Sequence, residues 1–355
     1  MDHRMRIGYS FWGFLGSGIT DTPDGGRSHR RAFINAIQGA GHDVVFLQPN
    51  RDLLEAGDRV ADRYVFDGGL PGIDVLFTEW RWPIDGRNTT ACTADGHTCD
   101  LHRQTELLDH YTHALGTPSI VWDKDRMLPL KDPLRRHRGV VVCEAALAPT
   151  PGARSLLFPV DDALLAEADP AGLAAQPRTF TLAYVGNQYD RDEAFDRYFA
   201  PAAAHVPHQV AGKWPNAGRW PGVHFVGRVP FSAVSRIYAE SVATVLLLPD
   251  RYAAVGQMTQ RIFEAVLAGC VPLAPSTIAH VDQFVPEQLI VDDGEDVLAA
   301  VHWLVCNAGT AEHADLIAAC LAKLDVFQLS RQVQALQTIL GELDAPRPQA
   351  ARAGR

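Results

Sequence analysis

The stretch ATVLLLPDRYAAVGQMTQRIFEAVLAGCVPLAPS, residues 243–276, predicts a strand, a helix and a second strand in succession. Its two ends, residues 243–249 and 270–276, are apolar runs of strand length. Between them, apolar residues recur at helical spacing and predict a helix over about residues 258–268. A helix that connects two buried strands is the repeating unit of a parallel sheet covered by helices.

The same alternation extends over most of the chain. Further apolar runs lie at residues 5–11, 42–48, 73–80, 118–123, 139–146, 154–160, 179–187, 208–212, 222–227 and 288–293. Residues 161–178 hold no such run and carry Pro170, Gly172 and Pro177, the composition of a connector. We therefore predict an α/β protein of two Rossmann-like doubly wound domains facing a cleft. The predicted limits are 1–165, 178–325, and 326–355 for a C-terminal helix and disordered tail.

Composition excludes several classes of protein. The chain is 47% hydrophobic, which excludes a disordered protein. Its 355 residues are more than a single hydrophobic core usually holds, which favours two domains. With 32 Lys and Arg against 42 Asp and Glu, the formal net charge is −10, which disfavours bulk binding to nucleic acid. No segment has the pattern of a signal peptide or a membrane span, and the six cysteines fit reduced thiols. We therefore predict a cytoplasmic protein without an integral membrane segment.

The start of the helix at residues 258–268 is a candidate phosphate site. Gly256, Gln257, Met258 and Thr259 precede the apolar stripe, and free N–H groups at such a start attract anions. Arg261 is suited to contact a diphosphate, and Glu264 is suited to accept hydrogen bonds from ribose hydroxyls. Because these two residues are three apart on one helix face, an ordinary surface ion pair is the alternative interpretation.

This segment resembles the donor-binding region of group 1 nucleotide-sugar glycosyltransferases of the GT-B fold, in a divergent form. The family pattern is a glutamate, seven residues, then Glu-Ala-x-x-x-Gly-x-Pro, and its latter part is matched by Glu264, Ala265, Gly269 and Pro272. Gly256 stands where the family has its first glutamate. This departure leaves the usual donor-sugar contact, and the retaining or inverting outcome, open.

The resemblance implies further donor-binding residues, each on a loop after a predicted strand. In the second domain these residues are Gly186, Asn187, Lys213, Arg228 and Val229. In the first domain, Gly16 of the glycine-rich loop is a further donor-binding candidate. For Lys213, a solvated loop charge is the alternative.

The resemblance also assigns acceptor binding to the first domain, where attack by a hydroxyl needs a general base. Candidates on loops after predicted strands are Asp21, Asp24, His29, Glu79, Asp123 and Asp125. Asp24 and His29 are the preferred candidates for the general base because of their position, and Asp123 is a third candidate. The alternatives are a helix cap for Asp24, a packed histidine for His29, and a charge pair with Lys124 or Arg126 for Asp123.

The end of the polar segment at residues 80–100 carries Cys92, His97 and Cys99, and His102 follows two residues after it, at the spacing C-x4-H-x-C-x2-H. These are zinc-ligand types, but the spacing matches no common zinc ribbon or finger. The sequence therefore favours an acceptor-gripping loop over a zinc site. No metal or other cofactor is predicted.

We predict a metal-independent glycosyltransferase that moves a sugar from a nucleotide-sugar donor to an acceptor hydroxyl. Two alternatives stay open: a sugar-nucleotide epimerase of similar shape, and a catalytically degenerate protein that only binds a nucleotide or a sugar. We predict a small molecule or a glycan precursor as the acceptor. The negative net charge of the chain disfavours a modified nucleobase in DNA as the acceptor. Donor identity and oligomeric state cannot be deduced from the sequence.

Overall fold

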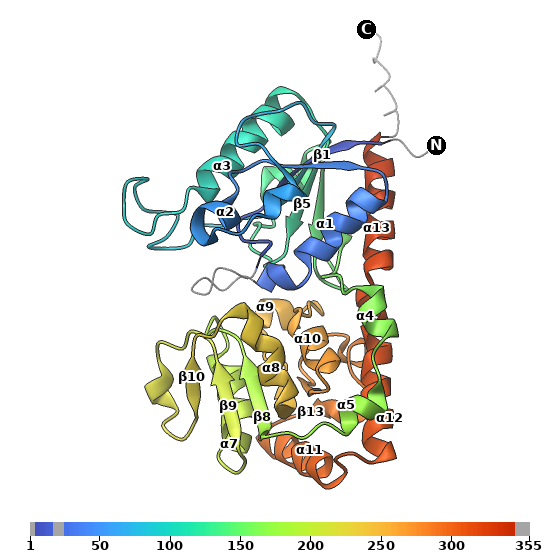
Figure 1. Ribbon diagram of the computed structural model, residues 1–355. Helices are drawn as coiled ribbons and strands as arrows, with labels where there is room; N and C mark the ends of the chain where they lie inside the picture. Colours follow the sequence, from blue (N-terminus) through green and yellow to red (C-terminus); the bar gives the residue numbers. More distant parts are fainter. Residues whose placement is uncertain (1–3, 17–24, 345–355) are drawn as a thin grey trace.

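Two parallel β-sheets organise the residues that the computed structural model describes, 4–16 and 25–344 (Figure 1). The first sheet has seven strands in the order β3-β2-β1-β4-β5-β6-β7, and the second has six in the order β10-β9-β8-β11-β12-β13. All strand pairs are parallel. The first-sheet strands are β1 (Arg6–Ser10), β2 (Asp43–Phe46), β3 (Val65–Phe66), β4 (Val75–Glu79), β5 (Ser119–Asp123), β6 (Val140–Glu144) and β7 (Arg154–Ser155). The second-sheet strands are β8 (Phe180–Val185), β9 (His208–Ala211), β10 (Phe225–Gly227), β11 (Ser241–Val245), β12 (Val271–Pro275) and β13 (Ile290–Val291).

Helices connect the strands and cover the sheets. Those of the first half are η1 (Gly25–Ser28), α1 (Arg30–Gly39), α2 (Arg51–Ala56), η2 (Val60–Asp62), α3 (Asp100–Leu107), the π-helix η3 (Leu108–Ala114) and η4 (Pro133–Arg136). The connector carries α4 (Asp162–Ala166) and α5 (Pro170–Ala174). The second half has α6 (Asp192–Ala194), the π-helix η5 (Phe195–Phe199), α7 (Ala200–Ala203), η6 (Ala217–Arg219), η7 (Phe231–Ala233), α8 (Val234–Ala239), α9 (Asp250–Ala253), α10 (Arg261–Leu267), η8 (Val281–Gln283), η9 (Glu287–Leu289), α11 (Gly294–Cys306), α12 (Ala311–Lys323), η10 (Leu324–Phe327) and α13 (Leu329–Asp344).

The predicted fold class is confirmed, with local differences. The connector holds no strand, as expected, whereas strand β3 was not predicted and β7 is much shorter than the apolar run at 154–160. The predicted helix at 258–268 begins only at Arg261, because the chain first makes a turn in which the Ile262 N–H donates to the Thr259 carbonyl. Among the helices described, none combines the length and apolar character that a bilayer span requires.

The final helix returns to the first half of the chain. In Figure 1, α13 runs beside α1 at one side of the molecule, and the two helices are in contact. The Gln332 side chain accepts a hydrogen bond from the Leu157 N–H at 2.8 Å, and Val160 forms a β-bridge with Gln328. The backbone therefore passes between the two halves at the connector and again at the start of α13.

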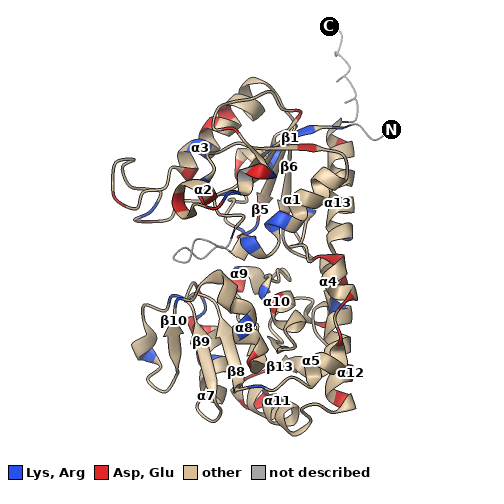
Figure 2. Ribbon diagram, viewed as in Figure 1, with Lys and Arg blue, Asp and Glu red and all other residues tan. Residues whose placement is uncertain are grey.

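The carboxyl edges of the two sheets face each other. The Gln257 side chain, after β11, donates to the Lys124 carbonyl, after β5, at 2.5 Å. The Leu147 N–H, after β6, donates to the Gly256 carbonyl at 3.1 Å. Lys and Arg are interspersed with Asp and Glu over both halves (Figure 2). Ligands of open parallel sheets bind at this edge, so the facing edges define where to look for a site.

Candidate functional site

The second sheet brings most of the predicted donor-binding residues onto one edge. Gly186 and Asn187 follow β8, Lys213 follows β9, and Arg228 and Val229 follow β10, and these strands are neighbours. The Lys213 N–H donates to the Asn187 side-chain oxygen at 2.7 Å, which ties two of the loops together. The Lys213 side chain is exposed on this edge. Long-range pairing of strands, not nearness in sequence, creates this group of residues.

Gly212 lets two of these loops approach closely. Its φ is +137°, and a Cβ atom built there would lie 2.0 Å from the Gly186 carbonyl oxygen. A left-handed φ of this kind and so close an approach both require glycine.

We expect Gly212→Ala to separate the β8 and β9 loops. Backbone strain alone costs about 1–3 kcal/mol, and the displaced Lys213 loop should weaken binding of a nucleotide sugar at least about tenfold. Gly222→Ala is the matched control, because nothing lies within 4 Å of a Cβ atom there. Calorimetric titration of both variants checks the prediction, and equal affinities would contradict it.

Helix α10 places Arg261 and Glu264 beside the first domain. Arg261 Nη1 lies 2.5 Å from a Glu264 carboxylate oxygen, and the two side chains are 24% and 12% exposed. Burial opposes the charge on Arg261, but Glu264 more than compensates and raises the pKa of Arg261 above its ordinary value. The ion pair of the alternative interpretation therefore forms, but it is partly enclosed and does not lie at an open surface. Gln257 and Met258, just before the helix, are buried, and Thr259 is half-buried.

Ser28 completes this group from the other domain. Its hydroxyl donates to the second Glu264 oxygen across the domain boundary. Next to it, the Arg27 guanidinium stacks on Phe231 of the second domain, with 5.0 Å between Arg27 Cζ and the ring centroid. Gly25 approaches Gln260 so closely that a Cβ atom would meet its amide nitrogen at 1.9 Å. The sequence analysis did not select Arg27 and Ser28; the signal was their place on the loop after the first strand, which also carries the candidates Gly16, Asp21, Asp24 and His29.

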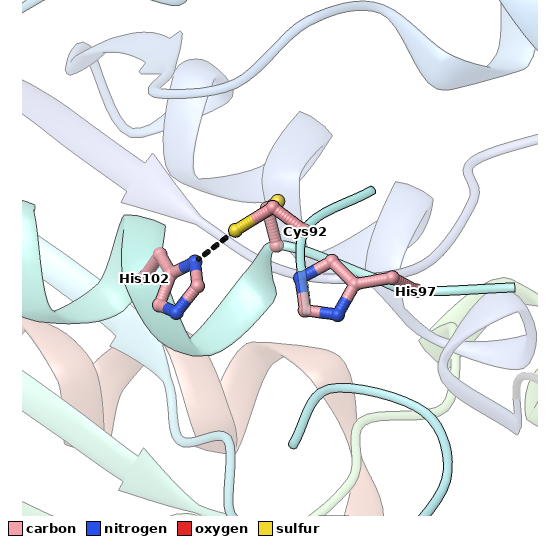
Figure 3. Close-up of side chains that lie close together, drawn as sticks. Cys92, His97 and His102 are labelled. Atoms are coloured by element: carbon pink, nitrogen blue, oxygen red, sulfur yellow. Dashed lines mark hydrogen bonds between the residues drawn. The ribbon is translucent and has the colours of Figure 1, made fainter. Parts of the chain in front are cut away.

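Four cysteine and histidine residues from the segment before α3 and from the first turn of α3 come together. Cys92, His97, Cys99 and His102 each offer one ligand atom, and these atoms all lie within 4.8 Å of one another. Cys92 Sγ lies 3.3 Å from His102 Nδ1, and Figure 3 shows Cys92, His97 and His102 directed toward one another. The same segment borders a small cavity at the carboxyl ends of β1 and β4, whose lining includes Ser10, Trp12, Thr78, Arg81 and Asp100.

The predicted base candidates take different positions. Asp24 and Asp21 lie outside the described residues. His29 is 1% exposed, and its ring packs against Trp122 and Phe158 with centroid distances of 5.8 and 4.8 Å. This placement favours the alternative of a packed histidine.

Asp123 and Gly16 are engaged within the first domain. Asp123 is fully buried and accepts hydrogen bonds from the Met127 and Leu128 N–H groups at 2.9 and 2.8 Å. Burial raises the pKa of Asp123 despite these two hydrogen bonds. The Gly16 N–H donates to the Asp52 carboxylate at 2.8 Å. Asp123 thus stabilises the turn after β5, and its charged partner is Arg135 at 3.7 Å instead of the Lys124 or Arg126 of the alternative interpretation.

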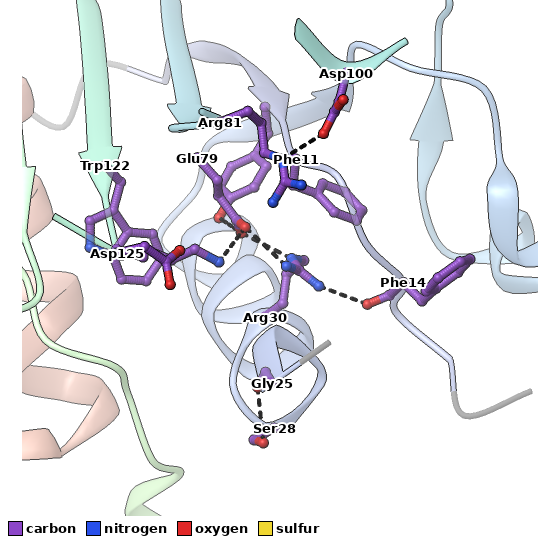
Figure 4. Close-up of polar contacts among 12 residues, drawn as sticks. Phe11, Phe14, Gly25, Ser28, Arg30, Glu79, Arg81, Asp100, Trp122 and Asp125 are labelled. Atoms are coloured by element: carbon purple, nitrogen blue, oxygen red, sulfur yellow. Dashed lines mark hydrogen bonds and ion pairs between the residues drawn. The ribbon is translucent and has the colours of Figure 1, made fainter. Parts of the chain in front are cut away.

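Glu79 lies at the centre of a buried ionic cluster (Figure 4). Its two oxygens accept from Arg30 at 2.9 Å each, and it also pairs with Lys124. The Tyr9 hydroxyl donates to it at 2.9 Å. Burial would raise the pKa of Glu79, yet Arg30 and Lys124 hold this pKa well below its ordinary value. A carboxylate so strongly paired stabilises the loop arrangement and is poorly suited to accept a proton.

Glu144 forms a second cluster of the same kind. It ends β6, accepts from Arg126 at 2.6 Å and from Arg135 at 2.9 Å, and also accepts from the Thr150 N–H. Burial opposes the charge, but these hydrogen bonds lower the pKa of Glu144. Successive neighbouring strands β4, β5 and β6 therefore each end in a buried carboxylate, Glu79, Asp123 and Glu144.

We expect the protein to lose stability in acid because of Glu79 and Glu144. Both have folded-state pKa values below the unfolded value of 4.5, so their stabilisation is complete above that pH. It is lost as the pH falls below about 4.5 toward the lower folded-state values, since protonation then accompanies unfolding. Urea unfolding followed by circular dichroism at pH 7, 5, 4 and 3 measures the change. A free energy of unfolding that stays constant from pH 5 to 3 would contradict this attribution.

The comparisons with known proteins agree with this arrangement. Residues 191–334 match the family model described as glycosyl transferase-like. No curated protein sequence matches the chain. Among solved structures, T4 phage β-glucosyltransferase has a TM-score of 0.59 at 10% identity, covering 96% of this chain and 100% of that one. An α-glucosyltransferase in complex with UDP-glucose and DNA containing an abasic site has a TM-score of 0.58 at 11% identity, covering 97% and 100%. AviGT4, a glycosyltransferase involved in avilamycin A biosynthesis, has a TM-score of 0.55 at 14% identity, covering 95% and 98%.

These similarities test two of the predictions, the fold and the family resemblance. The fold extends over nearly the whole chain, which confirms the predicted GT-B arrangement of two Rossmann-like domains. The family match covers most of the second domain, extends into α13 and includes Lys213, Arg228, Arg261 and Glu264, so the predicted resemblance to glycosyltransferases is confirmed there.

Proposed function

We propose that this chain, a glycosyltransferase by its second domain and GT-B by its fold, transfers a sugar from a nucleoside diphosphate donor to an acceptor hydroxyl. The observation that carries the proposal is the position of Glu264. It lies on the domain that matches the glycosyl transferase-like family, and its carboxylate reaches the first domain through Ser28. A donor bound there would be held where an acceptor on the first domain could reach it.

On the donor side, Glu264 would accept hydrogen bonds from the two ribose hydroxyls. Arg261 and Lys213 would then stabilise the negative charge that develops on the departing diphosphate. Gly186 and Asn187 would line the same edge, and Arg228 and Val229 would contact the nucleobase. Because these cations supply the positive charge, we propose that the transfer step needs no catalytic metal. Activity that depends on an added divalent cation would contradict this part.

On the acceptor side, the first domain would supply the base if the reaction inverts. Asp24 remains the leading candidate, and its chain neighbour Gly25 lies against Gln260 of the second domain. His29 and Asp123 are weaker candidates because both side chains are buried within the first domain. The formal charge of −10 would repel a DNA backbone, so we propose a small molecule or a glycan precursor as the acceptor.

A screen of nucleotide sugars tests the proposal. UDP-, GDP- and dTDP-sugars are added to the full chain, and the melting temperature should rise with the true donor, since a ligand that binds only the folded state stabilises it. The donor found is then incubated with and without candidate acceptors. Transfer that requires an acceptor supports the proposal. Conversion of the donor sugar without any acceptor would indicate an epimerase instead, and binding without turnover would indicate a degenerate binding protein.

A further inference from the structure

The cysteine and histidine cluster at residues 92–102 has the dimensions of a metal site. Tetrahedral zinc, bonded to sulfur at about 2.3 Å and to nitrogen at about 2.0 Å, holds its ligand atoms roughly 3.3–3.8 Å apart. The four ligand atoms here already lie within 4.8 Å of one another. Small movements would therefore bring them into coordination.

The histidines present suitable nitrogens. His97 Nδ1 lies 3.0 Å from the Thr90 hydroxyl, which leaves Nε2 for another partner. That Nε2 atom is buried and has no hydrogen-bond partner among the described residues. A histidine that ligates a metal usually has its second nitrogen fixed by such an outer hydrogen bond. An imidazole nitrogen that is buried and unpaired within a cluster of thiols points to a cation between them.

The other ligands are positioned by a helix. Cys99 is the N-cap residue of α3 and His102 lies in its first turn, three residues later, so the two share one helix face. The helix start is fixed by Asp100, which is buried and pairs with Arg81 at 2.8 Å. Two ligands thus come from a rigid element and two from the loop before it, and a metal would fasten the loop to the helix.

We propose that Cys92, His97, Cys99 and His102 bind one structural zinc ion. The sequence spacing alone favoured no metal, and the assembled geometry reverses that preference. Thiolate and imidazole ligands suit zinc, and four protein ligands leave no open position for catalysis. The ion would hold the segment from Arg81 to Asp100, which borders the cavity at the carboxyl ends of β1 and β4. Its role is therefore to shape the acceptor side without taking part in transfer.

The metal content of the purified full chain tests this proposal. We expect about one zinc per chain, and less than about a tenth of that in the double variant Cys92→Ser, Cys99→Ser. Cys306→Ser is the matched control, because Cys306 is also exposed but lies on α11. Replacing zinc by Co²⁺ should give the intense visible absorption of a tetrahedral site with thiolate ligands.

A second readout separates metal binding from a folding defect. Trypsin cleavage after Arg87, inside the fastened loop, should be about tenfold faster in the double variant than in the zinc-loaded chain, while circular dichroism stays unchanged. Three results would overturn the proposal: no stoichiometric zinc after reconstitution, equal zinc loss in Cys306→Ser, or a Cys92–Cys99 disulfide that persists in reductant. None of these readouts depends on transferase activity.

Discussion

Replacing Glu264 by glutamine is expected to raise the dissociation constant of the nucleotide-sugar donor about 100-fold, or about 2.7 kcal/mol. Glutamine keeps the shape of the side chain but removes the negative charge that would accept two hydrogen bonds from ribose. It also leaves Arg261 without its partner at 2.5 Å, so the melting temperature must be recorded alongside. Calorimetric titration with the donor from the thermal-shift screen measures the effect.

Ser28→Ala is the informative control for that experiment. Ser28→Ala removes the hydrogen bond between Ser28 and Glu264 but keeps the carboxylate, whereas Glu264→Gln removes the carboxylate and keeps a side-chain oxygen that can accept from Ser28. In the ligand-free protein Ser28 occupies an oxygen that the ribose would need, so Ser28→Ala should bind the donor equally well or slightly better. Glu295→Gln, on an exposed part of α11, controls for loss of one negative charge. Unchanged donor affinity in Glu264→Gln would remove Glu264 from the donor site.

The sheet edge that carries the candidate donor-binding residues was predictable because local pattern and topology act together there. Once parallel strands alternate with helices, the loops after β8, β9 and β10 must lie on one edge. Gly186, Lys213 and Arg228 therefore come together without any knowledge of their side-chain contacts. The family resemblance added the proposed role of Glu264 in donor binding, which periodicity alone leaves as half of an ion pair.

The contacts that organise the first domain were not predictable in this way. Glu79 ends a strand and was weighed as a base, but its partners Arg30 and Lys124 lie 49 and 45 positions away. Nothing in the local pattern selects such pairs, since they depend on the register of β4 against β1 and β5. The nearness of Cys92, His97, Cys99 and His102 was not predictable for a different reason, because their spacing matches no common zinc motif and only the folded loop brings them together.

Replacing Glu79 by glutamine is expected to destabilise the first domain by about 3–5 kcal/mol. The substitution leaves two cations in a site where Glu79 and Arg30 are 3% and 1% exposed, and their desolvation is then uncompensated. Glu55→Gln is the matched control, since Glu55 pairs with Arg51 at the surface and is 43% exposed. Exposed pairs of that kind contribute about 0–1 kcal/mol.

Urea unfolding at pH 7, followed by circular dichroism, distinguishes the two variants. With two domains the transition is expected to split in Glu79→Gln, the first domain unfolding at lower urea and the second domain at its original midpoint. At urea concentrations below the first unfolding transition, Glu79→Gln should still bind the donor. The reason is that no candidate donor-binding residue of the second domain contacts Glu79. If Glu79→Gln is as stable as Glu55→Gln, the cluster does not hold the facing edge of the first sheet. Glu79 would then return as a candidate base, since a carboxylate that can be neutralised without loss of stability is free to take up a proton.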